Sequence, residues 1–254
     1  MEMKKKHAPV LSETFKKNSF EMNAWTNSSC VVGIDEVGRG CLAGPLVTAA
    51  VILPAFTRYA LLKDSKIMTT EERQKAFKWI KKHCFYGISI VHNRIIDKHN
   101  IWQTTLIAMK KSLMNVIEIA DCTPSAILID AMPLDVSDTH ISNIPVYRFY
   151  HGERKSASIA AASIVAKITR DAIMNSMDRI IPGYKWSNNK GYATSIHRNA
   201  LQEHSHSIIH RMSFLKNMVF HNNNSQDSQL SLDTLNDFNQ EIDSDETNTL
   251  CRNN

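Results

Sequence analysis

The stretch VGIDEVGRG, residues 32–40, decides the fold and the chemistry expected of this chain. The apolar run 30–34 is bounded by turn-forming residues, which is typical of a buried strand. It ends in Asp35 and Glu36, two adjacent carboxylates that repel each other and are costly to bury without a cation. The glycines of the turn 38–40 permit a close approach to a ligand, and Arg39 suits a phosphate or a carboxylate. Alone, the stretch fits two interpretations equally: a hard metal ion beside a phosphate, or a strand-end aspartate that caps a turn, with Glu36 in solvent.

Length and composition indicate a globular protein of a reducing compartment. The chain has 254 residues, 43% of them hydrophobic, enough for one large domain or two small ones. The start shows no secretory signal, and the longest apolar-rich run, residues 41–56, is broken by glycine and proline and is too short to span a bilayer. The five cysteines are odd in number and form no C-x-x-C pair, which argues against a disulfide framework or a zinc ribbon. We therefore expect a cytoplasmic protein without membrane contact.

Charge is distributed unevenly along the chain. The formal net charge is +5, but residues 222–254 carry seven acids and a single arginine, so residues 1–221 carry about +11. A basic body favours a polyanionic partner such as nucleic acid, although many basic proteins bind none. The acidic segment is rich in Asn, Asp and Ser, and we expect it to be a disordered tail.

Hydrophobic periodicity predicts an α/β domain, a mixed sheet flanked by helices, at residues 29–221, after a polar extension at residues 1–28 without clear period. A capping box, Thr69-x-x-Glu72, predicts a helix that ends near His83, and helical spacing predicts two more at residues 101–120 and 158–181. Apolar runs predict strands at residues 30–34, 46–53, 84–91, 126–129 and 145–149.

Two further acids resemble Asp35 in their setting. Asp130 ends another short apolar strand, AILID, and the ends of neighbouring strands in an α/β sheet converge on one ligand site. Asp171 lies inside the third predicted helix, four residues after Lys167. Each has a simpler interpretation: a turn residue before Pro133 for Asp130, and a surface ion pair with Lys167 for Asp171. The acids together are stronger evidence for a functional site than any one of them alone.

Taken together, these motifs resemble the type 2 ribonucleases H, specifically ribonuclease HII. The similarity covers most of residues 30–215, and the motifs occur in family order. They are GIDEVGRG with LAGP (42–45) and AAVIL (49–53), LKDSK (62–66), LID (128–130), IAAASIVAKITRD (159–171), PGY (182–184), NKGYAT (189–194) and HRMSF (210–214).

The resemblance implies a ribonuclease-H-like fold with a C-terminal helical part and a metal-dependent endoribonuclease. Its four active-site carboxylates fall on Asp35, Glu36, Asp130 and Asp171 and would hold Mn²⁺ or Mg²⁺, hard ions that prefer oxygen ligands. Two such ions, about 3.5–4 Å apart, stabilise the attacking and the leaving oxygen of a phosphodiester. The implied substrates are the RNA strand of RNA–DNA hybrids and single ribonucleotides in duplex DNA, cut on the 5′ side to give 3′-hydroxyl and 5′-phosphate ends. The implied processes are ribonucleotide excision repair and DNA replication.

The resemblance also implies a substrate site. The backbone of Gly38, Arg39 and Gly40 would wrap the ribose, whose 2′-hydroxyl distinguishes RNA from DNA, and Tyr192 would stack on the sugar after the scissile bond. Without the family, Tyr192 would be an ordinary loop aromatic. The expected phosphate contacts, each of which a solvated surface position also explains, are Lys63, Ser65, Lys66, Lys167 and Lys190.

Some positions depart from the family pattern, and two rival functions stay open. Cys41, Ala131 and Glu153 replace the proline, glycine and aspartate that are common there, and none of them is an expected metal ligand. The rivals are a ribonuclease HIII-like enzyme, which carries an extra N-terminal substrate-binding domain, and a non-catalytic nucleic-acid-binding module of the same fold. His206 and His210 have helical i,i+4 spacing, but we expect surface or core histidines there because the glutamate of a zinc protease motif is missing. We expect a monomer, and contact with a replication clamp is not assignable to any segment.

Overall fold

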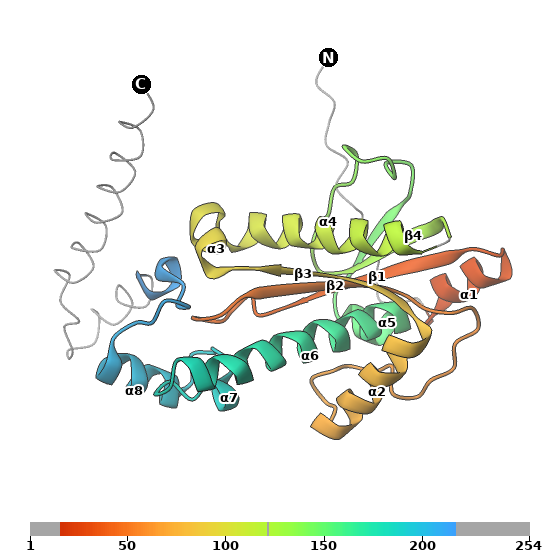
Figure 1. Ribbon diagram of the computed structural model, residues 1–254. Helices are drawn as coiled ribbons and strands as arrows, with labels where there is room; N and C mark the ends of the chain where they lie inside the picture. Colours follow the sequence, from red (N-terminus) through yellow and green to blue (C-terminus); the bar gives the residue numbers. More distant parts are fainter. Residues whose placement is uncertain (1–15, 121, 217–254) are drawn as a thin grey trace, which may run out of the picture.

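The computed structural model describes residues 16–120 and 122–216, which are built around a mixed five-stranded sheet (Figure 1). The strand order is β3-β2-β1-β4-β5, with antiparallel pairing among the first three strands and parallel pairing of β1 with β4 and of β4 with β5. The strands are β1 (Cys30–Val37), β2 (Leu46–Ile52), β3 (Phe85–Val91), β4 (Pro124–Asp130) and β5 (Val146–Phe149). The predicted mixed sheet is confirmed.

Helices cover both faces of this sheet. In Figure 1, α3 and α4 lie over one face, and the long α6 runs under the other face together with α1, α2 and α5. The helices α7 and α8 follow α6 and form the C-terminal helical part. The bounds are α1 (Ser19–Thr26), α2 (Thr70–His83), α3 (Asn93–His99), α4 (Ile101–Ile119), α5 (Gly152–Lys155), α6 (Ala157–Ile180), α7 (Trp186–Asn189) and α8 (Ser195–His204).

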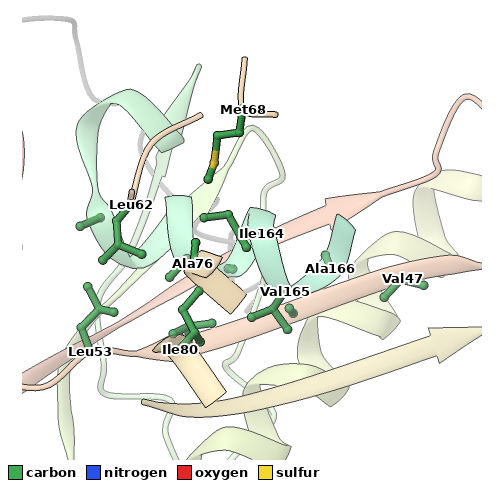
Figure 2. Close-up of a cluster of buried hydrophobic side chains, with 14 of the residues drawn as sticks. Val47, Leu53, Leu62, Met68, Ala76, Ile80, Ile164, Val165 and Ala166 are labelled. Atoms are coloured by element: carbon green, nitrogen blue, oxygen red, sulfur yellow. The ribbon is translucent and has the colours of Figure 1, made fainter. Parts of the chain in front are cut away.

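The first turn of α6 packs directly on the middle of β1. A Cβ atom at Gly33 would lie 2.1 Å from the backbone carbon of Ser158, so only glycine lets helix and strand approach this closely. Further along α6, Ile164 joins an apolar cluster with Val47 of β2 and Ile80 of α2, all fully buried (Figure 2). This packing fixes α6, which carries several candidate site residues, relative to the strand that carries Asp35 and Glu36.

The predicted helices agree with the structure to within one residue, whereas the end of the first strand was predicted wrongly. The capping box of α2 is present, with the Glu72 N–H donating to Thr69 Oγ1 and the Thr69 N–H donating to Glu72 Oε2. The strand β1 does not stop after Ile34 but continues through Asp35 and Glu36 to Val37. The reason is tertiary: the antiparallel ladder with β2 continues along both acids, which oppose Ala49 and Thr48.

In the N-terminal region, the described residues 16–28 contain a helix that the sequence did not predict. The helix α1 lies within residues 1–28, for which no period was recognised, and it buries Glu21, Ala24 and Trp25. The acidic segment 222–254 and its expected disorder lie outside the described residues. Within residues 16–120 and 122–216, no helix is both long and apolar enough to cross a membrane.

Candidate active site

A cavity of about 340 Å³ opens at the ends of β1 and β4. Seven of the predicted site residues line it, together with three that the sequence analysis did not single out, Val37, Arg73 and Ser163. The seven are Asp35, Glu36, Ser65, Lys66, Asp130, Lys167 and Tyr192. Residues from two strands, two helices and two loops therefore meet in one hollow.

Asp35 is the most deeply buried of these carboxylates, with 7% of its surface exposed. Its Oδ1 accepts the Glu36 N–H at 2.7 Å, and the Ser163 hydroxyl donates to the same carboxylate. Ser163 also pairs with Ser65, at 2.7 Å between the two hydroxyl oxygens. Burial above all, and then the charges of Glu36 and Asp130, raise the pKa of Asp35 well above its ordinary value. A bound cation would offset both the burial of Asp35 and its repulsion by the neighbouring carboxylates.

Glu36 is only partly compensated by its neighbour Arg39. Arg39 Nη1 lies 3.4 Å from Glu36 Oε1, while Glu36 Oε2 is buried and accepts no hydrogen bond. Burial raises the pKa of Glu36 to about 7; Arg39 opposes this rise, and the charge of Asp130 adds to it. A buried carboxylate oxygen without a donor is costly, so Glu36 Oε2 is available to a cation.

The other two predicted ligands are held differently. The Gly152 N–H donates to Asp130 Oδ1 at 2.8 Å, and Asp130 lines the cavity. Asp171 Oδ1 lies 2.9 Å from Lys167 Nζ, and Asp171 is not among the lining residues. The structure thus brings three of the four carboxylates to the cavity and shows the fourth in the helical ion pair that its spacing also allowed.

The donor set suits Mn²⁺ or Mg²⁺, but it is not assembled into a coordination shell. Across residues 16–120 and 122–216, no group of three or more Asp, Glu, His or Cys side chains is arranged to hold a metal ion. The donors are carboxylate oxygens, which hard divalent cations prefer, and Glu36 contributes the buried oxygen without a partner. In chemistry and charge, the residues fit a divalent cation.

Two buried arginines pack against the turn at residues 38–40, and one of them donates a hydrogen bond to it. Gly38 has φ +94°, and a Cβ there would lie 2.3 Å from Arg170 Nε, so this position requires glycine. Arg211 Nη1 donates to the Arg39 carbonyl at 3.0 Å, and Arg170 Nε donates to the Pro45 carbonyl at 2.9 Å. Arg170 and Arg211 are both fully buried. Arg211 thus holds the backbone of the turn, Arg170 packs against Gly38, and the Arg39 side chain faces Glu36.

Tyr192 reaches the cavity from the loop after α7. Its side chain is 39% exposed, and burial of the rest raises the pKa of its hydroxyl to about 12. Arg170 lies 5.9 Å from the centre of the Tyr192 ring and donates to the carbonyl of Lys190. Cys41, which departs from the family pattern, is fully buried beneath Tyr192 and hydrogen bonds with its side chain. Cys41 is thus a packing residue.

The remaining predicted phosphate contacts point elsewhere. Lys63 forms an ion pair with Glu72, at 2.9 Å. Lys190 donates to the side chain of Asn175 and, at 2.6 Å, to the carbonyl of Ser187. Neither lysine lines the cavity, and neither do Gly38, Arg39 and Gly40, which adjoin its Val37 wall.

Arg73 is the cavity residue that sequence reasoning missed altogether. Its Nη1 donates to the carbonyls of Ser65 and Met68, at 3.0 and 2.5 Å, so it orders the loop that carries Ser65 and Lys66. The sequence offers only a weak signal for this role: Arg73 lies one turn after the Thr69 cap, where a helical side chain faces the preceding loop. Ser163, by contrast, lies inside a motif that was quoted.

Comparison with known proteins identifies the family of this chain. A family model described as Ribonuclease HII matches residues 32–217. The chain belongs to the ribonuclease HII family. Ribonuclease HII of Lactobacillus johnsonii is 39% identical over 210 residues, which cover 82% of this chain and 80% of the relative. Ribonuclease HII of Listeria innocua is 41% identical over 211 residues, covering 82% and 77% of the two chains.

Solved structures show the same fold at lower identity. The ribonuclease HII in a PCNA complex from Archaeoglobus fulgidus superposes with a TM-score of 0.60 at 22% identity, covering 81% of this chain and 99% of that one. Bst-RNase HIII in complex with Mn²⁺ gives a TM-score of 0.56 at 21% identity, covering 73% of this chain and 67% of that one. The fold is shared, and the family match favours ribonuclease HII over the HIII-like rival.

Proposed function

We propose that this ribonuclease H cuts the RNA strand of RNA–DNA hybrids and cuts duplex DNA on the 5′ side of a single embedded ribonucleotide. The products would carry 3′-hydroxyl and 5′-phosphate ends. The observation that supports this most is the meeting of Asp35, Glu36 and Asp130 with Tyr192 in one cavity beside the turn 38–40. Carboxylates alone suit many metal sites; carboxylates beside a sugar-sized aromatic platform and a glycine turn suit a nuclease that reads ribose.

Asp35, Glu36, Asp130 and Asp171 are the proposed ligands of Mn²⁺ or Mg²⁺. When bound, these ions would supply an activated water and stabilise the leaving oxygen. The chain's own part is to hold the carboxylates: Ser163 and the Glu36 N–H fix Asp35, and the Gly152 N–H fixes Asp130. The Mn²⁺ complex of a structural relative is consistent with this choice of metal.

The cavity walls supply the charge that a nucleic-acid backbone requires. Lys66, Arg73 and Lys167 line the cavity together with the carboxylates, so it holds both positive and negative groups. Cations at these positions would contact the phosphates that flank the scissile bond. The basic body of the chain extends this attraction beyond the cavity.

The choice of ribose over deoxyribose is assigned to the turn 38–40 and to Tyr192. The turn offers backbone groups, and a Cβ at Gly40 would meet no protein atom within 4 Å, so a sugar can lie against this backbone. Tyr192 presents its partly exposed ring in the cavity that this turn adjoins. Reading one sugar in this way permits cleavage at a single ribonucleotide.

The biological setting follows from the proposed substrates. Cleavage of hybrids and embedded ribonucleotides belongs to DNA replication and ribonucleotide excision repair in the cytoplasm, carried out here by a monomer. The archaeal relative was solved in a PCNA complex. A comparable clamp contact in this chain is not assigned to any segment.

The decisive experiment is cleavage of end-labelled duplex DNA that contains one ribonucleotide, in Mg²⁺, Mn²⁺ or EDTA. All-DNA duplex and a long RNA–DNA hybrid serve as controls. We expect metal-dependent cutting 5′ to the ribonucleotide and none of all-DNA. Cutting of the long hybrid alone would remove the sugar-reading roles of the turn 38–40 and Tyr192. Tight duplex binding by folded protein without any cutting would establish the non-catalytic module instead.

A further inference from the structure

Two buried histidines lie behind Tyr192 and take no part in the function proposed above. His197, on α8, is 0% exposed, and His210, near the end of the described residues, is 1% exposed. Their Nε2 atoms lie 3.0 Å apart. Buried polar side chains are retained where a network satisfies them, so the partners of each ring nitrogen define what this pair does.

The hydrogen bonds fix the tautomer of each ring. His197 Nδ1 lies 2.9 Å from the carbonyl oxygen of Tyr192, which only accepts, so Nδ1 of His197 carries the hydrogen. Nε2 of a neutral His197 is then an acceptor, and Nε2 of His210 must donate to it. His210 Nδ1 in turn accepts the Ser207 N–H at 2.8 Å. When both rings are neutral, every donor in this chain of hydrogen bonds therefore faces an acceptor.

The electrostatics agree with two neutral rings. Burial lowers the pKa of both histidines, that of His210 to about 3, where the charge of His197 adds to the effect. Protonation of His197 would place two donors against each other at Nε2. Protonation of His210 would place its Nδ1 hydrogen against the Ser207 N–H. The pair His197–His210, called the histidine strut below, therefore stays neutral and hydrogen bonded at neutral pH and does not act as a titrating switch.

The histidine strut is anchored at His210, and aromatic rings pack against both of its imidazoles. Asn93 of α3 donates to the carbonyl of His210 at 2.7 Å. The ring of Trp186 lies 5.0 Å from that of His197, and the ring of Tyr184 lies 5.1 Å from that of His210. The Tyr192 carbonyl is thus connected through two imidazoles to a different layer of the molecule.

These contacts also argue against a metal site at the histidines. Both nitrogens of His197 and both nitrogens of His210 already have partners within the chain. His206 and His210 do not lie on a helix, so the i,i+4 spacing noted in the sequence does not place them on one face. His210 is a core histidine, the alternative that the sequence analysis preferred.

We propose that His197, held in its tautomer by His210, is a positioning residue for Tyr192 that sets the preference for a single embedded ribonucleotide over a long hybrid. The proposal rests on the sugar-reading role given above to Tyr192. A single ribonucleotide offers one productive register, so a displaced Tyr192 loses it, whereas a long hybrid offers many registers and tolerates the displacement. His197 does not face the cavity, so its effect passes through the Tyr192 backbone.

The test compares His197→Asn, His197→Gln and His197→Leu. An Asn amide reaches roughly the place of Nδ1 and keeps a donor for the Tyr192 carbonyl, a Gln amide lies nearer Nε2, and Leu has no donor. For each variant, kcat and KM are measured on the single-ribonucleotide duplex and on a long hybrid, together with the melting temperature. Arg198→Ala, an exposed neighbour on α8, is the matched control, and Tyr192→Ala marks the full loss of the ring.

We expect Gln and Leu to lower kcat/KM on the single-ribonucleotide duplex at least about tenfold, with hybrid cleavage changed less than about threefold. His197→Asn should recover most of the loss. An unchanged ratio between the two substrates in folded variants overturns the proposal. So does an equal loss on both substrates that follows the melting temperature and that Asn does not rescue, because this describes a merely structural role. Where Leu does not fold, the Asn and Gln pair decides.

An independent readout needs no activity. Imidazole ¹⁵N spectra of the wild-type protein at pH 7 should show His197 with its hydrogen on Nδ1 and His210 with its hydrogen on Nε2, and other tautomers contradict the histidine strut. If the wild-type protein cuts hybrids but not single ribonucleotides, the proposed function of Tyr192 fails first, and the positioning role fails with it. If it cuts both, only the variant ratios bear on His197.

Discussion

Asp35 and Asp130 lie side by side on two adjacent parallel strands, near the C-terminal end of β1 and at that of β4, one residue beyond the paired residues Ile34 and Ile129. They are far apart in the sequence and meet only because β4 crosses over to pair with β1. Their proximity has an electrostatic price, since the charge of Asp130 adds to the raised pKa of Asp35. The proximity that suits a metal site therefore lowers the stability of the metal-free protein, so substitutions at this pair should change both activity and stability.

Replacing Asp35 with asparagine should separate cleavage from binding. We expect Asp35→Asn to lower the cleavage rate at least about a hundredfold, because a proposed metal ligand is lost. Duplex binding should be unchanged or tighter, since one negative charge beside the phosphates is removed. The melting temperature in EDTA should rise because a buried repulsion is removed. Cleavage assays, fluorescence anisotropy with labelled duplex and thermal unfolding measure the three effects.

The matched control for this variant is Asp138→Asn, which removes the same charge from an exposed residue paired with Lys110. It should leave cleavage unchanged. Full activity of Asp35→Asn would refute the assignment of the metal site.

The stability of the metal-free protein should fall as the pH rises through 7. The pKa of Glu36 is raised to about 7 in the folded state, above its ordinary value of 4.5. A carboxyl with a raised folded pKa contributes stability below its unfolded pKa, and this contribution disappears as the pH rises through the folded value. In EDTA, the melting temperature should therefore decrease between pH 6 and pH 8, and Glu36→Gln should flatten the decrease.

Divalent cations should reverse that decrease. Mn²⁺ or Mg²⁺ bound to the folded state stabilises it by mass action, most strongly at pH 8, where the carboxylates are charged. Thermal unfolding at pH 6 and pH 8, with and without metal, gives the comparison. A metal-induced shift that is equal at the two pH values, or that survives in Asp35→Asn, would contradict binding at this site.

Features that depend on residues close in the sequence were predicted correctly, whereas features that depend on contacts between distant elements were not. The start of the helix after Thr69 is predicted correctly because its capping box is local. Asp35 was placed after a strand that in fact continues through it, because the continuation depends on β2, a separate element. Arg73 was missed because its role depends on the path of the loop at Ser65, which no local pattern specifies.

A methyl group at Gly40 should impair cleavage without affecting the fold. A Cβ there meets no protein atom within 4 Å, and the backbone φ lies outside the left-handed region, so Gly40→Ala should keep the wild-type melting temperature. If a ribose packs against this backbone, the methyl group will collide with it, and cleavage at a single ribonucleotide should fall about tenfold or more. Steady-state kinetics on the single-ribonucleotide duplex measure the loss.

Gly38→Ala provides the contrast to Gly40→Ala. At φ +94°, with Arg170 Nε only 2.3 Å from the new Cβ, it should lower the melting temperature and the activity together. Wild-type kinetics for Gly40→Ala would show that the sugar does not lie against this turn.

Removal of the carboxylate of Glu21 should destabilise the protein while sparing its chemistry. Glu21 is fully buried, and its Oε1 accepts the Ser156 hydroxyl at 2.5 Å and the Ser158 N–H at 3.1 Å, at the N-terminus of α6. We expect Glu21→Ala to cost about 1–3 kcal/mol, because it leaves buried donors unpaired and removes a negative charge from a helix N-terminus. Urea unfolding measures the cost, with Met22→Ala, an exposed neighbour, as control. Cleavage per folded molecule should stay near wild type. A stability loss no larger than that of Met22→Ala would show that α1 does not anchor the catalytic helix.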